Sequence, residues 1–272
     1  MLYLHYLTLN KKFMKFNIKK IPDKSIVSFF KKKKIANHIL NNLKPYIATN
    51  NENTKVLLGP NLSDLYFIYK LITLSKRVTS LEFGCGFSSE IIASALLENK
   101  QKYHKKIKNL RRIFPFQNHV LDASKKYIKI TKKRSSYLKN LIFYYSECEI
   151  AKYNGKYTVQ YKNLPLLSPD FIYLDGPSPY HVKKNKLFNF NIQQQDLFPI
   201  SSDILLIEYY LIPGTIILVD GRGANAQFLR DHFVRKWSYK YYSNFDMHLF
   251  CLKADALGKI SKRQLNFFNN HN

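Results

Sequence analysis

The chain has 272 residues, of which 46% are hydrophobic and 15% aromatic, so it can fill the core of one sizeable domain and does not resemble a disordered chain. Its formal net charge is +26, but it is also rich in Asn, Ile, Tyr and Phe and poor in Gly, a bias typical of A/T-rich coding that raises the Lys content by itself, so the charge alone does not predict nucleic-acid binding. No CxxC pair suggests zinc, no run of about 18 apolar residues suggests a membrane span, and the first residues lack a signal-peptide pattern, which together predict a cytoplasmic protein.

The first 57 residues predict a basic helical extension. Residues 1–44 hold 11 Lys and a single acid, Asp23, and residues 29–47 predict a basic amphipathic helix that ends near Pro45. We interpret this segment as a solvated arm, with an anionic surface or partner as the alternative. Met14 is an alternative start of translation.

Residues 58–257 predict one domain of alternating helices and strands. Asn61 or Ser63 can cap a first helix, and a strand over Val78–Phe83 is followed by a helix over Ser88–Glu98. Residues 100–112 hold seven cations and no acid, which indicates an exposed insertion. A short strand over His119–Leu121, a helix capped by Ser124 and a strand over 141–147 come next.

The second half predicts a hairpin, then two further strand–helix units. Asn154-Gly155 lies between two β-prone arms and favours a type I′ turn. We expect a buried strand within residues 169–177 that ends at Asp175 and a strand within residues 215–225 that ends at Asp220. We also expect a helix over 203–214 closed by Pro-Gly and a helix over 226–237. Residues 238–254 break at Ser243-Asn244 into two final strands, and residues 258–272 predict a polar C-terminal tail that frays.

This alternation predicts a three-layer α/β/α fold of the Rossmann-like kind. Its sheet is mostly parallel, with helices on both faces and a C-terminal antiparallel strand pair. In such sheets, ligands bind at the carboxyl ends of the strands. Four acids occupy those ends in this chain: Glu82, Asp122, Asp175 and Asp220. Because their carboxylates repel each other, a purely structural sheet has no reason to gather them there.

The stretch from Glu82 to Ser89 favours a nucleotide-like ligand. Gly84 and Gly86 follow a strand and open a helix, so they permit a tight turn and a close approach to a ligand. Ser89 stands where a dinucleotide fingerprint has its third glycine. An acid two residues before the first glycine suits a cationic amine better than a pyrophosphate, and Asp122 suits a ribose diol.

"LEFGCGFSS" resembles motif I of the class I S-adenosylmethionine-dependent methyltransferases. The resemblance covers residues 58–253, since "HVLDAS", "FIYLDGP", "GTIILVDGR" and the final strand pair resemble the other motifs of that family. It implies a seven-stranded Rossmann-like sheet with a reversed last hairpin. The separation of 40 residues between Glu82 and Asp122 is about twice the usual spacing of about 20, and the basic insertion accounts for the excess.

The resemblance also implies roles for individual residues. Glu82 would steer the amine of the methionine moiety, Asp122 would hold the ribose hydroxyls, and Asp175 would face the methyl group or the acceptor. The remaining cofactor contacts that it implies are Gly84, Gly86, Ser88 and, near adenine, Ser146 and Glu147.

Methyl transfer needs an aligned nucleophile and a group that removes its proton. Asp175 and His181 are the candidate catalytic bases, with an exposed loop histidine as the alternative for His181. Asp220 and Arg222 are candidate substrate-binding residues, and Arg222 suits an anionic acceptor. Asp175, Asp220 and Asn225 resemble the Mg²⁺ ligands of catechol- and macrocin-type O-methyltransferases, but Gly-Arg follows Asp220, so we predict no metal and keep Mg²⁺ as the less favoured alternative.

The sequence thus predicts S-adenosylmethionine-dependent methyl transfer to a small-molecule or saccharide acceptor, at oxygen. The adjacent prolines that mark many DNA amino-methylating enzymes are missing from "DGPSPYH". One alternative is a methyltransferase of RNA or another polyanion, which would use residues 11–34 and 100–112. The others are a nicotinamide dehydrogenase and a non-catalytic nucleotide-binding module.

Overall fold

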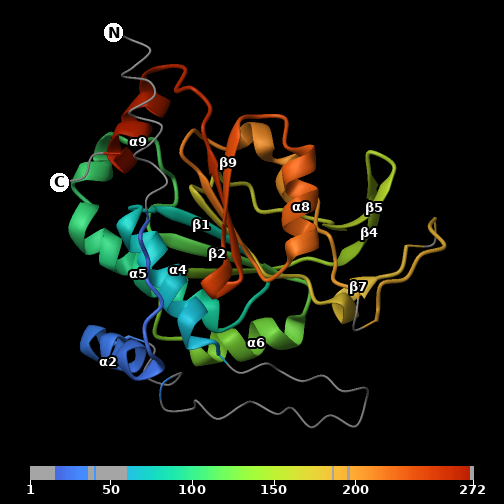
Figure 1. Cartoon of the computed structure of the whole chain (residues 1–272), viewed down its shortest axis with the longest axis horizontal. Coiled ribbons are helices and arrows are strands. Elements are labelled where there is room, and N and C mark those ends of the chain that lie inside the picture. The colour runs from blue at the N-terminus through green and yellow to red at the C-terminus, as the bar shows by residue number, and fades with distance from the viewer. Residues whose placement is uncertain (1–15, 36–39, 41–59, 186, 195–196, 270–272) are drawn as a thin grey trace.

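The computed structural model describes residues 16–35, 40, 60–185, 187–194 and 197–269 (Figure 1). Met14, most of the predicted helix over residues 29–47 and the proposed domain boundary at residues 57 and 58 lie outside these ranges. Across the described residues, no helix combines the length and the apolar character needed to cross a bilayer.

A seven-stranded sheet forms the centre of the molecule, with strand order β3-β2-β1-β6-β8-β10-β9. The first five strands in this order are parallel, and β10 runs antiparallel to both β8 and β9. This confirms the predicted Rossmann-like sheet and its reversed last strand pair. The strands are β1 (Thr79–Phe83), β2 (Gln117–Asp122), β3 (Leu141–Tyr145), β6 (Phe171–Leu174), β8 (Ile216–Asp220), β9 (Trp237–Tyr242) and β10 (Met247–Leu252).

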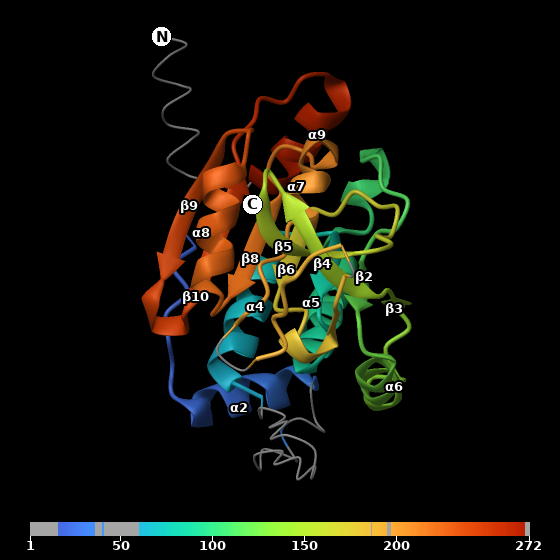
Figure 2. The same cartoon turned by 90° about the vertical axis from the view of Figure 1, so that its right-hand side faces the viewer.

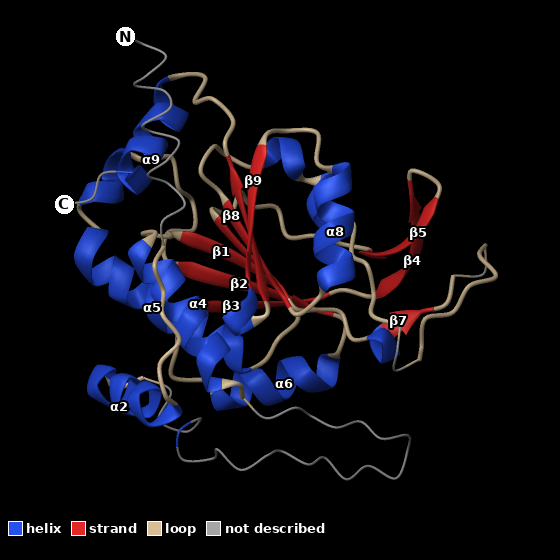
Figure 3. Cartoon of the chain, in the orientation of Figure 1, coloured by secondary structure: helices blue, strands red, loops and turns tan. Residues whose placement is uncertain are grey.

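Helices cover both faces of this sheet, as the blue and red ribbons of Figure 3 show. α4 and α5 pack together over one face, where α2 packs on α4, and α8 covers the other face together with the short α7. The helices are α2 (Asp23–Lys33), α4 (Leu62–Leu74), α5 (Phe87–Tyr103), α6 (Lys125–Arg134), α7 (Asp203–Leu206), α8 (Gly223–His232) and α9 (Lys259–Asn269), with 3-10 turns η1 (Lys106–Asn109), η2 (Pro179–His181), η3 (Glu208–Tyr210) and η4 (Ser243–Phe245).

A second, three-stranded sheet combines two strands that lie between β3 and β6 in the chain with a short strand that follows β6. It consists of β4 (Cys148–Tyr153), β5 (Lys156–Tyr161) and β7 (Val182–Lys183), in the order β5-β4-β7. Its apolar side joins the core beneath α7 and α8, whereas the β4–β5 hairpin projects beyond α8 (Figures 1 and 2). Asn154 and Gly155 at the hairpin tip both have positive φ, as the type I′ turn requires.

The predicted helix caps are present. The Asn61 side chain accepts hydrogen bonds from the backbone N–H groups of Ser63 and Asp64 at the start of α4. The Ser124 hydroxyl accepts one from the Tyr127 N–H at the start of α6. Each cap satisfies a backbone donor that has no partner within its helix.

Three predictions about helices were wrong. Residues 203–214 form only the single turn of α7 and the 3-10 turn η3. The region after Gly258 is not frayed but forms α9, whose Gln264 and Phe268 are buried. The basic N-terminal helix begins earlier than predicted and ends at Lys34, which has a left-handed backbone.

Candidate functional site

The carboxyl ends of the parallel strands gather acids, as the sequence predicts. Glu82 lies in β1, Asp122 ends β2, Asp220 ends β8 and Asp175 directly follows β6. Since β1 lies between β2 and β6, and β8 follows β6, these positions share one edge of the sheet. This edge is the expected ligand site of an open α/β fold.

Two further acids join this edge. Asp64 lies in the first turn of α4, and Asp246 has a left-handed backbone just before β10. Burial and the nearby Asp220 and Asp246 carboxylates raise the pKa of Asp64 to about 7, although Lys20 opposes the shift. Neither residue could be singled out from the sequence, because an Asp is common in the first turn of a helix, as at position 64, and in a tight turn, as at position 246.

The glycine bend between β1 and α5 serves two purposes. Gly84 has a φ of +91°, and a Cβ on it would lie 3.0 Å from the backbone nitrogen of Gly176. Gly84 therefore allows the loops after β1 and β6 to touch. A Cβ on Gly86 would meet nothing nearer than the Ser88 Oγ at 3.9 Å, so the space beside Gly86 is open.

Glu82 is fully buried behind this bend. Its two carboxylate oxygens accept hydrogen bonds from the Ser88 hydroxyl at 2.6 Å and from the Asn118 amide at 2.8 Å. Burial outweighs these bonds and raises the pKa of Glu82 to about 7. Glu82 and Ser88 were both predicted to contact the cofactor. In the structure they are hydrogen-bonded to each other, and this bond anchors the start of α5.

Asp122 clamps the same bend from the neighbouring strand. One carboxylate oxygen accepts a hydrogen bond from the Cys85 N–H at 2.7 Å, and the other accepts one from the Ser124 N–H at 2.6 Å. Asp122 is 7% exposed. A carboxylate has about four acceptor sites, so the clamp leaves capacity for a ligand hydroxyl.

Ser146 and Glu147 differ in their surroundings. Ser146 is buried, and its hydroxyl accepts a hydrogen bond from the Asn163 N–H. The Glu147 carboxylate pairs with Lys162 at 3.0 Å and with Lys183. Hydrogen bonds from these two lysines lower the pKa of Glu147 to about 2, so it stays charged.

Asp175 and Asp220 form the centre of the acidic edge. The Asp175 side chain is 49% exposed, whereas Asp220 accepts a hydrogen bond from the buried Tyr173 hydroxyl at 2.8 Å. The enclosing protein and the Asp220 carboxylate raise the pKa of Asp175. Burial also raises the pKa of Asp220, and the Tyr173 hydrogen bond opposes it.

Arg222 is the cation closest to this pair. Its Nη2 donates to the carbonyl oxygens of Asp175 at 2.6 Å and Pro177 at 3.2 Å, and its Nε lies 3.9 Å from the Asp175 carboxylate. The side chain is 9% exposed, and its buried Nη1 has no hydrogen-bond partner in the structure. Arg222 therefore fixes the loop after β6 and keeps one donor free.

The other two candidates, His181 and Asn225, each contact residues other than Asp175 and Asp220. The His181 ring, in η2, packs edge-on against Tyr127 of α6 with ring centroids 5.3 Å apart. Asn225 is buried in α8, and its amide both accepts from the Ser201 N–H and donates to the Ser201 carbonyl.

This engagement of Asn225 does not fit the Mg²⁺ set of Asp175, Asp220 and Asn225. The amide oxygen that would bind the ion is already held by the backbone of Ser201. Among the described residues, no three His, Cys, Asp or Glu side chains are grouped as metal ligands would be. These contacts give Asn225 a role in holding the backbone of Ser201, and the Mg²⁺ set remains the less favoured alternative.

Comparisons with known proteins give distant similarities of structure alone. No protein-family model matches the chain, and neither does any curated protein. Among solved structures, SAH-bound methyltransferase PaMTH1 of Podospora anserina matches with a TM-score of 0.41 and 13% identity over 93% of this chain and 95% of that one. The O-methyltransferase TomG of Streptomyces achromogenes, in complex with SAM, matches with a TM-score of 0.41 and 11% identity over 85% of this chain and 96% of that one. An O-methyltransferase of Bacillus cereus in complex with SAH matches with a TM-score of 0.37 and 13% identity over 93% of this chain and 100% of that one.

Proposed function

We propose that this chain is an S-adenosylmethionine-dependent methyltransferase that acts on a hydroxyl group of a small-molecule or sugar acceptor. The observation that carries the proposal is the acidic edge beside the Gly84–Gly86 bend, where Asp64, Asp175, Asp220 and Asp246 gather. These four carboxylates form a locally acidic region in a chain that has 44 basic and only 18 acidic residues. Such an edge attracts a ligand with positive groups.

The residues of this edge fit S-adenosylmethionine. When bound, it supplies an activated methyl group on a sulfonium, and it also carries an ammonium group, so both positive centres suit the acidic edge. Apart from its chain neighbours, the nearest atom to a Cβ on Gly86 would be the Ser88 Oγ at 3.9 Å, so no close contact crowds that side of the bend. Asp122, which lies at the same bend, has acceptor capacity for ribose hydroxyls.

Asp175 is the residue best suited to remove a proton from an acceptor hydroxyl. Its side chain is half exposed, and its raised pKa makes the carboxylate a stronger base than an ordinary aspartate. Arg222 holds the loop that carries Asp175, and its free Nη1 can donate to an anionic group of the acceptor. A sugar that carries a carboxylate or a phosphate would present a hydroxyl to Asp175 and an anionic group to Arg222.

Cofactor binding is tested by titration calorimetry of the purified chain with S-adenosylmethionine, S-adenosylhomocysteine and NAD. We expect saturable binding of the first two and none of NAD. Mass spectrometry of the freshly purified protein should also detect bound S-adenosylhomocysteine. Binding of NAD alone, or of none of the three, would contradict the proposal.

A polyanionic acceptor such as RNA is the second candidate. α6 starts at the same edge, and five of its lysines are exposed: Lys125, Lys126, Lys129, Lys132 and Lys133. A methyl-transfer screen of sugars, phenols and RNA separates the two candidates. Preference for RNA, with binding that weakens steeply as salt rises, would favour the second.

A further inference from the structure

A cavity of about 490 Å³ lies at the opposite edge of the sheet from the acidic site. Thr79, the first residue of β1, lines it, together with residues that lie three or four positions before β2, β6 and β8: Phe114, Ser168 and Ile212. These are the amino ends of the strands, whereas the acids occupy the carboxyl ends. Cavities of this size commonly hold small organic ligands.

One buried arginine of the cavity wall, Arg112, belongs to a buried cluster that continues behind the wall with Arg77 and Asp170. Arg77 is fully buried, the Arg112 side chain is 4% exposed, and the one buried carboxylate between them is that of Asp170. Asp170 accepts a hydrogen bond from the Val78 N–H at 2.9 Å and pairs with the Arg112 Nη2 at 3.0 Å. The Asp170 carboxylate thus pairs directly with Arg112, whereas Arg77 donates to the backbone carbonyl of Asp170 at 3.3 Å.

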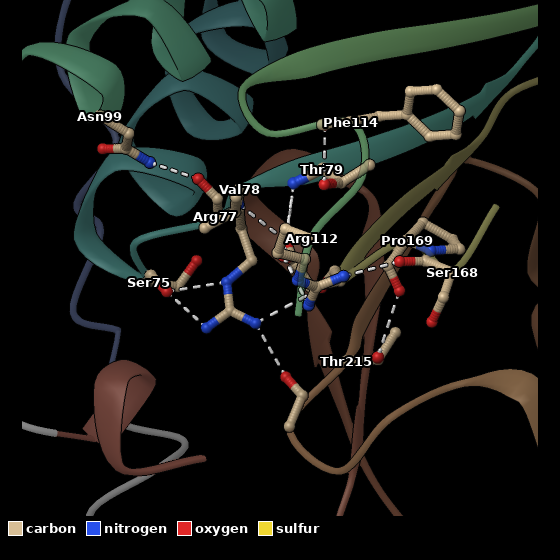
Figure 4. Close-up of polar contacts among 12 residues, drawn as sticks. Ser75, Arg77, Val78, Thr79, Asn99, Arg112, Phe114, Ser168, Pro169 and Thr215 are labelled. Atoms are coloured by element: carbon tan, nitrogen blue, oxygen red, sulfur yellow. Dashed lines mark hydrogen bonds and ion pairs between the residues drawn. The ribbon is translucent and has the colours of Figure 1, made fainter. Parts of the chain in front are cut away.

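Figure 4 shows how differently the two arginines are satisfied. Arg77 donates to the carbonyl oxygens of Ser75 at 2.7 Å and Gly214 at 2.8 Å, and its guanidinium lies 3.8 Å from the Phe268 ring centroid. Arg112 donates to the Ser168 carbonyl at 2.7 Å, but its buried Nε has no hydrogen-bond partner. Arg112, and not Arg77, lines the cavity.

A second unpartnered donor lines the cavity from α9. Gln264 is 3% exposed, and its Nε2 is buried without a hydrogen-bond partner in the structure. One turn earlier, the N-terminus of α9 lines the same cavity with Lys259, Ile260 and Ser261. The first backbone N–H groups of a helix have no partner within the helix and favour anions.

The rim of the cavity is apolar and exposed. Leu166 is 97% exposed, Leu257 88%, Ile113 82% and Ile260 48%. Arg111 and Lys259 add positive charge beside this rim, and none of the described residues that line the cavity is acidic. Exposed apolar side chains around a concave surface are typical of a binding site.

We propose that this cavity binds a small organic anion with an apolar body, such as an acyl or aryl phosphate, sulfonate or carboxylate. The anionic group accepts hydrogen bonds from Arg112, Gln264 and the first turn of α9, and the apolar body contacts the rim. The site is distinct from the methyl-transfer site, and its existence does not depend on the proposed function.

Calorimetric titration with three matched probes tests this proposal. They are 1-naphthalenesulfonate, its neutral analogue 1-naphthalenesulfonamide, and inorganic sulfate as the head group alone. We expect one-to-one binding of the sulfonate and binding of both other probes that is weaker by about tenfold or more. The sulfonamide lacks the negative charge, and sulfate lacks the apolar body.

Two charge-matched variants locate the site. R111E/K259E reverses two cations beside the cavity, and K132E/K133E makes the same change of charge on α6. We expect the first to weaken sulfonate binding by about tenfold and the second to leave it unchanged. Gln264→Met, which removes the amide donor at similar volume, should also weaken binding, with thermal unfolding confirming that each variant folds.

Absence of saturable sulfonate binding would overturn the proposal. Equal binding of the sulfonamide would show that the cavity does not select an anion, and would overturn it too. So would equal weakening in the two charge variants, which would reduce the binding to non-specific attraction by a highly basic chain.

Discussion

Gly84 and Gly176 are in direct backbone contact. A Cβ on Gly176 would lie 2.7 Å from both the nitrogen and the Cα of Gly84. Two loops that follow neighbouring strands, β1 and β6, are thereby locked together at the edge where the acids gather. Any side chain at either position forces the loops apart and shifts Asp175.

The two glycines of the bend should therefore respond differently to substitution. Gly84→Ala places a Cβ against Gly176 at a positive φ, and we expect a loss of about 1–3 kcal/mol in the free energy of unfolding. Gly86→Ala is the matched control, because its backbone is extended and the space beside it is open. It should keep its stability but bind S-adenosylmethionine more weakly. Urea denaturation and calorimetry measure the two effects, and equal destabilisation would contradict this assignment.

Glu82 should make stability depend on pH. Its pKa in the folded protein is about 7, above the ordinary value of 4.5, so the folded state holds the proton more tightly than the unfolded state. The stabilisation is complete below about pH 4.5 and is lost as pH rises through about 7.

Glu82→Gln removes this titration. Between about pH 5 and pH 7 we expect the decline of the unfolding free energy to become shallower by up to about 1.4 kcal/mol per pH unit. Urea denaturation across that range measures the slope. Parallel pH dependences for the variant and the native chain would rule out Glu82 as the titrating group.

Asp175→Asn should abolish most of the methyl transfer and leave cofactor binding largely intact. An amide cannot accept the acceptor's proton, and loss of a general base commonly lowers a rate by about 10²–10⁴-fold. Turnover and the Kd for S-adenosylmethionine, measured on the same preparation, separate the two effects. Unchanged turnover would remove Asp175 from the catalytic role.

Asp170→Asn should destabilise the chain strongly. It removes the carboxylate that pairs with the buried Arg112 guanidinium and that lies near the buried Arg77, and breaking a buried ion pair typically costs about 3–5 kcal/mol. Asp231→Asn is the control, since Asp231 is exposed on α8. A loss no larger than that of the control would mean that the two arginines do not depend on Asp170.

Local sequence signals predicted the elements that depend on neighbours along the chain. Asn154-Gly155 predicted the hairpin turn, and Asn61 and Ser124 predicted the starts of two helices. The apolar runs that end in Asp122 and Asp220 predicted two parallel strands. The alternation of these elements and the final strand pair predicted a mostly parallel sheet with one antiparallel pair, but they did not predict the strand order.

Features that depend on distant partners could not be predicted in this way. The need for glycine at position 84 arises from Gly176, far along the chain. α9 looked like a polar tail because its buried face consists of little more than Gln264 and Phe268, and the partner of Phe268 is the Arg77 guanidinium. Asp64 belongs to the acidic edge only because α4 begins beside it.

The placement of β10 has a consequence for the growing polypeptide. β10 is buried along its whole length and pairs with β8 on one side and β9 on the other. Until β10 has left the ribosome, the apolar strand β8 is already synthesised, but one of its edges has no hydrogen-bonding partner. A premature stop codon before residue 247 would leave that edge open to pairing with other chains, so such a fragment should aggregate even though most of the sheet has been synthesised.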